Sequence, residues 1–252
     1  MRIIGHRGAR NIWAENSLSG FRQVCDLKNV CDLKVDAVEL DVHLSADGEI
    51  MVIHDPLLER TTDHKGPVAG LSREALRKVR LNDTLGETIP TLAAVLDVFA
   101  PTGIELEIEM KMDALGNPYP GLLEKVIALV EARGMAARVV LTCFVPEVIQ
   151  EIKEKAPHMR RLASVDRRSC EAFGGVDATL RRFVDLGCII AVEQSLLRLA
   201  LDRALGIVGR EKLGVWVPNT LRELDYWLGQ PIAQITSDRP DLALQLLAAK
   251  AG

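Results

Sequence analysis

One pattern recurs along this chain: a short apolar run, then a longer stretch with apolar residues at helical spacing, then another short run. Such alternation predicts parallel strands joined by helices. The short runs are rich in Val, Ile and Leu, as strands buried on both faces are. The nine runs are Arg2–Gly5, Ala37–Val42, Ile50–Ile53, Ile104–Met110, Arg138–Phe144, Arg161–Val165, Cys188–Val192, Lys212–Val217 and Ile232–Thr236. The helices expected between them are Ser17–Leu27, Leu92–Phe99, Gly121–Ala132, Pro146–Lys155, Ala178–Leu186 and Leu197–Ile207.

Nine runs exceed by one the eight strands of a (β/α)8 barrel. The excess is explained between Val42 and Ile50, where Asp47-Gly48 is a strong hairpin signal. So short a link cannot join parallel strands, so we interpret Ile50–Ile53 as the return arm of a hairpin. The other eight runs predict a TIM barrel. A doubly wound sheet has the same alternation and stays the structural alternative, although no Gly-x-Gly-x-x-Gly follows the first run.

Composition limits the classes of protein to consider. The 252 residues contain no low-complexity segment or linker, which favours one domain over residues 1–252. The formal net charge of -4 argues against a broad grip on nucleic acid. No apolar run approaches the ~20 residues of a membrane span, and the first residues do not resemble a signal peptide. Five cysteines without a Cys-x-x-Cys pair indicate reduced thiols. We therefore expect a cytoplasmic protein without stable membrane association, of undetermined oligomeric state.

Charged residues gather at the ends of the early apolar runs. These clusters are His6-Arg7-Gly8, Glu39-Leu40-Asp41, His54-Asp55 and Glu109-Met110-Lys111. Charge in such places is costly unless it is paired or bound to a ligand or metal. In a barrel, the C-terminal ends of the strands carry the chemistry. The clusters therefore predict a functional site at one mouth of the barrel.

The spacing within these clusters predicts a cation site. Alternate residues of a strand share a face, so Glu39 and Asp41 point the same way, as do Glu109 and Lys111. Three carboxylates can then converge near one barrel mouth, where they would repel one another without a cation. Hard oxygen ligands suit Mg²⁺ or Ca²⁺.

The hairpin predicts where His54 lies. If Asp47-Gly48 forms a two-residue turn, Asp41 lies opposite His54. Directly paired residues share a face with Cβ atoms ~5 Å apart, so His54 would join the carboxylates. The site would then hold two histidines, Arg7, Lys111 and a hard cation. Arginine and lysine bind phosphate, and two histidines can serve as acid and base near neutral pH. These residues predict phosphoryl transfer or cleavage of a phosphate ester.

At this point the chain resembles the glycerophosphodiester phosphodiesterases over nearly its whole length. Each matching segment is short, but together and in order they are highly specific. The segments are His6-Arg7-Gly8, Glu15-Asn16-Ser17, Glu39-Leu40-Asp41-Val42, His54-Asp55-Pro56, Arg60-Thr61-Thr62, Ile89-Pro90-Thr91-Leu92, Glu109-Met110-Lys111, Trp216-Val217-Pro218-Asn219 and Thr236-Ser237-Asp238-Arg239-Pro240.

The resemblance implies a (β/α)8 barrel with a small insertion within Pro56–Pro90. It implies hydrolysis of a small-molecule glycerophosphodiester to sn-glycerol 3-phosphate and an alcohol. It implies that Glu39, Asp41 and Glu109 hold a divalent cation, and that His6 and His54 act as the acid–base pair. It also implies that Arg7 and Lys111 contact the phosphate and that Trp216 lines the glycerol side of the pocket.

Some residues depart from the family or stand outside its motifs. Glu107 replaces a common Asn and is either beside the metal ligands or neutral. Val217-Pro218 replaces the usual Thr-Val and puts the head-group contacts in doubt. We interpret Glu15 as first-turn helix charge near a Ser17 cap, and His43, His64 and His158 as surface or loop residues.

Two other functions stay open. One is a related metal-dependent phosphodiesterase acting on lysophospholipids, of phospholipase D type. The other is a phosphate-ligand binder without activity, which would normally have lost one of the five residues His6, His54, Glu39, Asp41 and Glu109; all five are present.

Overall fold

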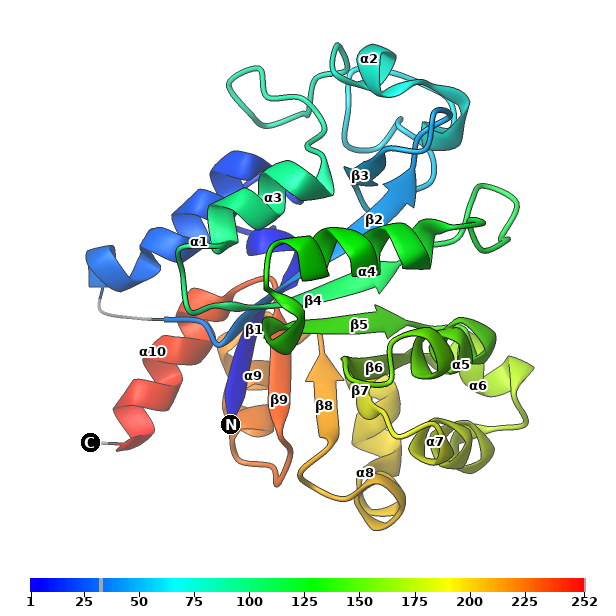
Figure 1. Ribbon diagram of the computed structural model, residues 1–252. Helices are drawn as coiled ribbons and strands as arrows, with labels where there is room; N and C mark the ends of the chain where they lie inside the picture. The colour runs from blue at the N-terminus through cyan, green and yellow to red at the C-terminus, as the bar shows by residue number, and fades with distance from the viewer. Residues whose placement is uncertain (32–33, 252) are drawn as a thin grey trace.

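A computed structural model describes residues 1–31 and 34–251, and it forms a TIM barrel (Figure 1). Eight parallel strands follow the order β1-β9-β8-β7-β6-β5-β4-β2 in the described chain, and pairing of β1 with β2 closes the sheet. This closure excludes the doubly wound alternative. The strands are β1 (Arg2–Gly5), β2 (Ala37–Leu44), β4 (Glu105–Met110), β5 (Val139–Cys143), β6 (Arg160–Val165), β7 (Ile189–Glu193), β8 (Leu213–Trp216) and β9 (Gln234–Ser237).

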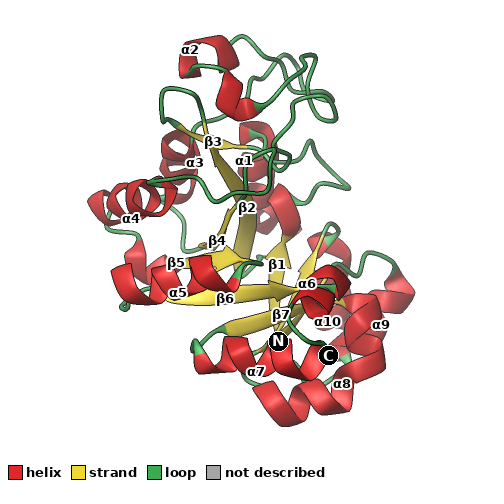
Figure 2. Ribbon diagram, turned by 90° about the vertical axis from the view of Figure 1, so that its right-hand side faces the viewer, coloured by secondary structure: helices red, strands yellow, loops and turns green. Residues whose placement is uncertain are grey.

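Helices surround the strands, as Figure 2 shows. Leu92–Phe99 and Pro146–Lys155 have the predicted bounds, and Thr91 caps the first by accepting a bond from the Ala94 N–H. The helices are α1 (Leu18–Cys31), α2 (Arg73–Leu76), α3 (Leu92–Phe99), α4 (Leu122–Ala132), α5 (Pro146–Lys155), α6 (Arg167–Ala172), α7 (Val176–Asp185), α8 (Gln194–Val208), α9 (Leu221–Leu228) and α10 (Pro240–Ala251).

Four of these helices, α2, α6, α9 and α10, were not predicted. Two of the four begin with capping boxes, in which the N-cap and N3 side chains each bond the other residue's backbone N–H. These pairs are Asp166 with Ser169, and Thr220 with Glu223. The capping signal was therefore present in the sequence at the start of α6 and α9.

The ninth strand, β3 (Ile50–Val52), is antiparallel to β2, so the predicted hairpin is confirmed. Its predicted register is wrong by one residue, because Asp41 O accepts a bond from the Ile53 N–H at 3.1 Å. The cause is a three-residue turn closed by the Ser45 N–H bond to Glu49 O, with Gly48 at a φ of 79°. Asp41 therefore does not pair with His54 across the ladder.

The segment 56–90 is the small insertion and lies beyond the ends of β2 and β3 (Figure 1). It contains only a 3-10 turn, Val68–Gly70, and the short helix α2. It has an apolar core separate from the main barrel core. That core comprises Met51, Ile53, Leu58, Val68, Leu76, Val79, Leu81 and Ile89. Burying these side chains fixes the insertion on the hairpin, beside the mouth of the barrel.

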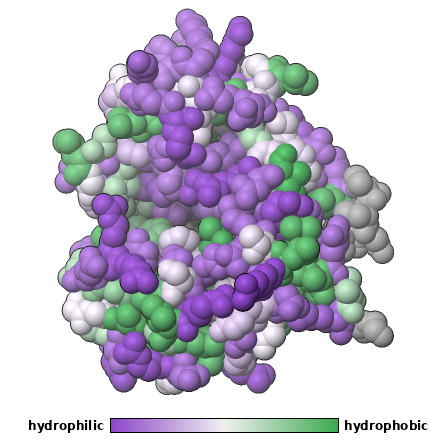
Figure 3. All heavy atoms as spheres, turned by 180° about the vertical axis from the view of Figure 1, so that it is seen from behind, coloured by the Kyte–Doolittle hydropathy of each residue, from purple (hydrophilic) through white to green (hydrophobic). Residues whose placement is uncertain are grey.

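On the face shown in Figure 3, hydrophilic side chains predominate and apolar ones lie in separate groups. None of the described helices is both long enough and apolar enough to cross a membrane.

Candidate active site

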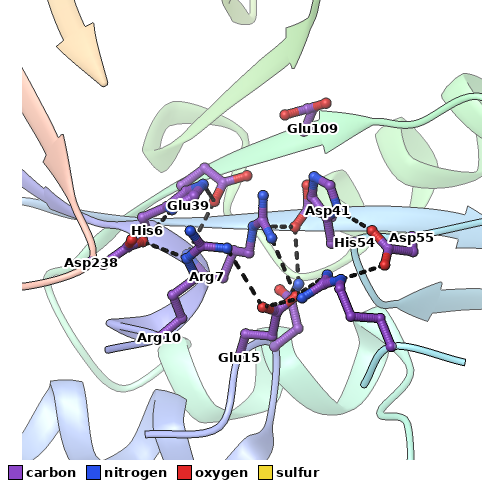
Figure 4. A network of polar contacts seen from close by, with 12 residues as sticks. His6, Arg7, Arg10, Glu15, Glu39, Asp41, His54, Asp55, Glu109 and Asp238 are labelled. Atoms are coloured by element: carbon purple, nitrogen blue, oxygen red, sulfur yellow. Dashed lines mark hydrogen bonds and ion pairs between the residues drawn. The ribbon is translucent and has the colours of Figure 1, made fainter. Parts of the chain in front are cut away.

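The clusters predicted from the sequence meet at the C-terminal mouth of the barrel, around a cavity of about 220 Å³ that we call the barrel cavity. Asp41 lies against it, within ion-pair distance of two of its lining side chains. The other predicted residues line it directly; these are His6, Arg7, Glu39, His54, Glu109, Lys111 and Trp216. Most of them are seen in Figure 4.

Three carboxylates come together because β2 and β4 are neighbours. Asp41 pairs with Glu109 in the ladder, and Glu39 lies two residues earlier on the same face. One oxygen from each carboxylate lies within 4.8 Å of the others. Glu39 Oε1 and Asp41 Oδ1 are buried, and neither has a hydrogen-bond partner in the described structure. Buried carboxylate oxygens without donors suit a hard cation, so the residues present fit Mg²⁺ or Ca²⁺.

The three carboxyl groups of the cluster differ in the direction in which their pKa values are shifted. Burial, together with the charges of Asp41 and Glu109, raises the pKa of Glu39 well above its usual range. Burial also raises the pKa of Glu109. For Asp41, burial favours the neutral form, but the charges of Lys111 and Arg7 outweigh it and lower the pKa. Negative charge therefore stays on Asp41, and a bound cation would favour ionisation of the other two.

Two cationic side chains lie beside this cluster. Lys111 Nζ is 2.8 Å from Glu109 Oε1 and 3.5 Å from Asp41 Oδ1. Arg7 Nε is 3.4 Å from Asp41 Oδ2, and its backbone N–H donates to Glu39 Oε2 at 3.1 Å. The first turn after β1 directs Arg7 inward, with its φ at 50°. Both cations face the cavity, where an anionic ligand would meet them.

His6 is oriented by a residue that the motif analysis did not assign a role. Its Nδ1 donates to Asp238 Oδ1 at 2.5 Å, which leaves Nε2 on the Glu39 side, 3.8 Å from Oε2. Asp238 also accepts bonds from Arg10 Nε and Asn219 Nδ2. Burial lowers the pKa of His6, although the bond to Asp238 opposes the shift. Asp238 stood within the Thr236–Pro240 motif, which was the available signal.

His54 reaches the cavity although its predicted pairing is wrong. It follows β3, and its Nδ1 donates to Asp55 Oδ1 at 2.6 Å. Burial lowers its pKa. Its backbone carbonyl accepts a bond from His43 Nε2 at 3.0 Å, and Tyr119 Oη lies 2.9 Å from His43 Nδ1. His43 is fully buried, so its interpretation as a surface or loop residue is wrong. It faces inward because β2 continues two residues beyond Val42.

Glu15 is part of the site network, so the interpretation as first-turn helix charge is wrong. Helix α1 begins at Leu18, and the Ser17 Oγ accepts the Gly20 N–H, which confirms the cap. Glu15 instead accepts from Arg7 Nη1 at 3.2 Å and from Arg60 Nη2 at 2.7 Å. The loop between β1 and α1 therefore connects the site with the insertion.

A second link runs through Arg60, whose Nε donates to Asp55 Oδ2 at 2.5 Å. Asn16, beside Glu15 in the chain, donates from Nδ2 to Asp41 Oδ2 at 2.9 Å. Asn16, Asp55 and Arg60 were all inside recognised motifs, but single positions in a motif do not reveal which partner each side chain contacts. Asn16 thus fixes Asp41 from the β1–α1 loop, while Arg60, through Asp55, fixes His54 from the side of the insertion.

Glu107 lies at the floor of the barrel cavity. Its Oε1 accepts a bond from Gln234 Nε2 at 3.1 Å, and it pairs with Glu39 across the β2–β4 ladder. Burial raises its pKa. Its burial favours the neutral alternative left open by the sequence, although the bond donated by Gln234 opposes that shift.

Trp216 lines the apolar side of the cavity. Its Nε1–H donates to Ala191 O at 3.1 Å, and its ring meets Phe144 edge-on at 5.7 Å between centroids. The cavity thus combines a charged wall of carboxylates, cations and histidines with an apolar wall around Trp216.

A sequence profile described as the glycerophosphoryl diester phosphodiesterase family matches residues 6–173, which contain every predicted site residue except Trp216. The chain belongs to this family. The family resemblance inferred from the motifs is therefore confirmed.

Individual relatives agree with this assignment. A glycerophosphodiester phosphodiesterase of Caldanaerobacter subterraneus is 31% identical over 163 residues, 63% of this chain and 64% of that protein. The match thus spans less than two thirds of that relative's length. A solved structure from Agrobacterium tumefaciens, whose assignment to the same family is provisional, is 25% identical with a TM-score of 0.88, covering 100% of this chain and 98% of that one. A second, a glycerophosphodiester phosphodiesterase from the same organism, is 24% identical with a TM-score of 0.76, covering 97% and 99%.

Proposed function

We propose that this protein hydrolyses glycerophosphodiesters to sn-glycerol 3-phosphate and an alcohol, with the aid of one divalent cation. The observation that carries the proposal is the cluster of Glu39, Asp41 and Glu109 beside one cavity that two half-buried histidines also line. Family membership supports the reaction class, and the Caldanaerobacter relative bears the name of this activity.

Glu39, Asp41 and Glu109 would hold the cation, either Mg²⁺ or Ca²⁺. When bound, it would supply positive charge to the phosphate oxygens. Arg7 and Lys111 add positive charge on the same side of the cavity, each held by a carboxylate of the cluster. The diester phosphate is an anion, and these two side chains would bind and orient it.

His6 and His54 would perform the proton transfers. One takes the proton from the nucleophile and the other protonates the leaving alcohol. With water as nucleophile, this step gives sn-glycerol 3-phosphate directly. With the glycerol 2-hydroxyl as nucleophile, it gives a cyclic phosphate, and water then breaks one ring P–O bond to give sn-glycerol 3-phosphate. Asp238 and Asp55 each accept the Nδ1–H of one histidine, so both Nε2 atoms are available for proton transfer. Because burial lowers both histidine pKa values, the neutral form of each is available near pH 7.

The glycerol arm of the diester would lie against Trp216, on the apolar side of the barrel cavity. Glycerol carbons fit such a wall, while its hydroxyls can reach the polar floor. The assignment of glycerol to this side rests on the family resemblance.

The test is release of glycerol 3-phosphate from glycerophosphocholine and glycerophosphoethanolamine, with and without chelator. We expect release that chelator abolishes and that added Mg²⁺ or Ca²⁺ restores. Release that survives chelation would contradict the role of the three carboxylates. No release under any cation, with turnover of a lysophospholipid instead, would favour the phospholipase D-type alternative.

A further inference from the structure

A second cavity, of about 410 Å³, adjoins the barrel cavity, and we call it the outer cavity. Its walls come from the β1–α1 loop, the start of α1 and the insertion. Arg10 lines both cavities. We propose that the outer cavity binds the head-group alcohol of the diester, and that it favours an uncharged polyhydroxy alcohol. This inference rests on the proposed function.

The geometry of the diester leads to this assignment. Its phosphate would lie by Arg7 and Lys111, and one arm would enter the barrel cavity, which ends at Glu107. The other arm must therefore leave through the mouth of the barrel. Arg10 stands at that mouth, held by Asp238 at 2.9 Å, and the outer cavity begins on its other side.

The wall between the cavities is built from ion pairs that also orient the site. Glu15 binds Arg7 on one side and Arg60 on the other. Arg60 in turn binds Asp55, the partner of His54. A group in the outer cavity would therefore lie next to the residues that fix His54, one of the two side chains proposed to transfer protons.

The charges of the outer cavity indicate an uncharged ligand. Its lining holds two positive side chains, Arg10 and Arg60, and two negative ones, Glu15 and Asp83. Three of these four are already held in ion pairs. A quaternary ammonium group prefers a cage of aromatic faces, whereas this cavity has one aromatic side chain, Trp13, and two guanidinium groups that would repel it.

Hydrogen-bonding capacity is left over for such a ligand. Within residues 1–31 and 34–251, the Asn11 side chain and Asn82 Oδ1 make no hydrogen bond. Asn82 Nδ2 makes only long contacts, 3.5 Å to Arg60 O and 3.4 Å to Thr62 O. Both asparagines line the outer cavity, Asn11 from the β1–α1 loop and Asn82 from the insertion. Amide groups of this kind can donate to and accept from hydroxyl groups.

The test compares two diesters that share the glycerophosphate half, glycerophosphoinositol and glycerophosphocholine. Steady-state kinetics would be measured for the unmodified protein, Asn11→Ala, Asn82→Ala and the control Asn117→Ala. Asn117 is exposed in another loop and lines neither cavity. We expect Asn11→Ala and Asn82→Ala each to raise the KM for glycerophosphoinositol by about threefold to tenfold, because each variant loses one hydrogen bond to the head group. The KM for glycerophosphocholine, both kcat values and the control should stay within twofold.

Two results would overturn the head-group proposal alone: hydrolysis of both diesters with KM values that neither variant changes, or equal KM increases for both diesters. Absence of glycerol 3-phosphate from both diesters at every cation tested would instead overturn the proposed function, and the head-group assignment with it.

Discussion

His6 Nδ1 lies 2.5 Å from Asp238 Oδ1, although 232 positions separate the two residues in the chain. Closure of the barrel brings them together, because β1 pairs with β9. A carboxylate that accepts the Nδ1–H fixes which ring nitrogen faces the cavity. Burial opposes ionisation of Asp238, but its bond to His6 and the charges of His6 and Arg10 outweigh burial. They lower the pKa of Asp238 to about 2. Asp238 therefore accepts from His6 as a carboxylate throughout the neutral range.

Asp238→Asn should lower kcat by about tenfold to a hundredfold, because the amide no longer selects the His6 tautomer. KM should change by less than about threefold, since Asp238 does not line the barrel cavity. The measurement is steady-state release of glycerol 3-phosphate, with thermal unfolding as a check on the fold. Asp241→Asn is the matched control, because Asp241 pairs only with Arg239 in the described contacts. Equal loss of activity in both variants would refute the positioning role.

Glu39→Gln should weaken binding of Mg²⁺ or Ca²⁺ at least about tenfold, because it removes one of three charged ligands and leaves the side-chain shape unchanged. Calorimetric titration of the cation in the absence of substrate measures this directly. Glu74→Gln changes an exposed carboxylate on α2 and should bind like the unmodified protein. Unaltered affinity in Glu39→Gln would contradict the cation site.

The buried side chain of His43 should make folding sensitive to acid. Burial lowers its pKa to about 4 from an ordinary value of 6.5, so the unfolded chain binds the proton more tightly than the folded one. Its contribution to stability is therefore complete above pH 6.5 and is lost as the pH falls towards 4. By pH 5 about 2 kcal/mol of the free energy of unfolding should be lost through this group.

Denaturant unfolding at pH 7.5 and pH 5 would measure this loss. In His43→Gln the difference between the two pH values should shrink by that amount, while exposed His64→Gln should behave like the unmodified protein. The same difference in His43→Gln as in the unmodified protein would show that His43 is not the group responsible.

Much of the fold, and the gathering of the candidate site residues at one mouth of the barrel, followed from local patterns. Runs of branched apolar residues marked the strands, and strand alternation correctly placed Glu39 and Asp41 on one face. The hairpin register failed because Asp47-Gly48 fits a two-residue or a three-residue turn, and one turn residue shifts every pair along the ladder.

The residues that support the site were harder to predict, because their contacts depend on closure of the barrel. His43 lies two residues after Asp41, on the same face of β2, yet its burial could be recognised only once β2 was known to continue to Leu44. Asp238 and His6 come from opposite ends of the chain. Glu15 meets Arg60 through the insertion, whose irregular backbone carries no periodic pattern.

The most direct test of the central claim is glycerol 3-phosphate release by His6→Ala and His54→Ala, each measured with saturating Mg²⁺ or Ca²⁺ and with the thermal unfolding temperature checked. The account predicts that each variant folds normally and loses at least about a hundredfold in kcat, because each removes one proton transfer. Near-normal turnover in both variants would contradict it.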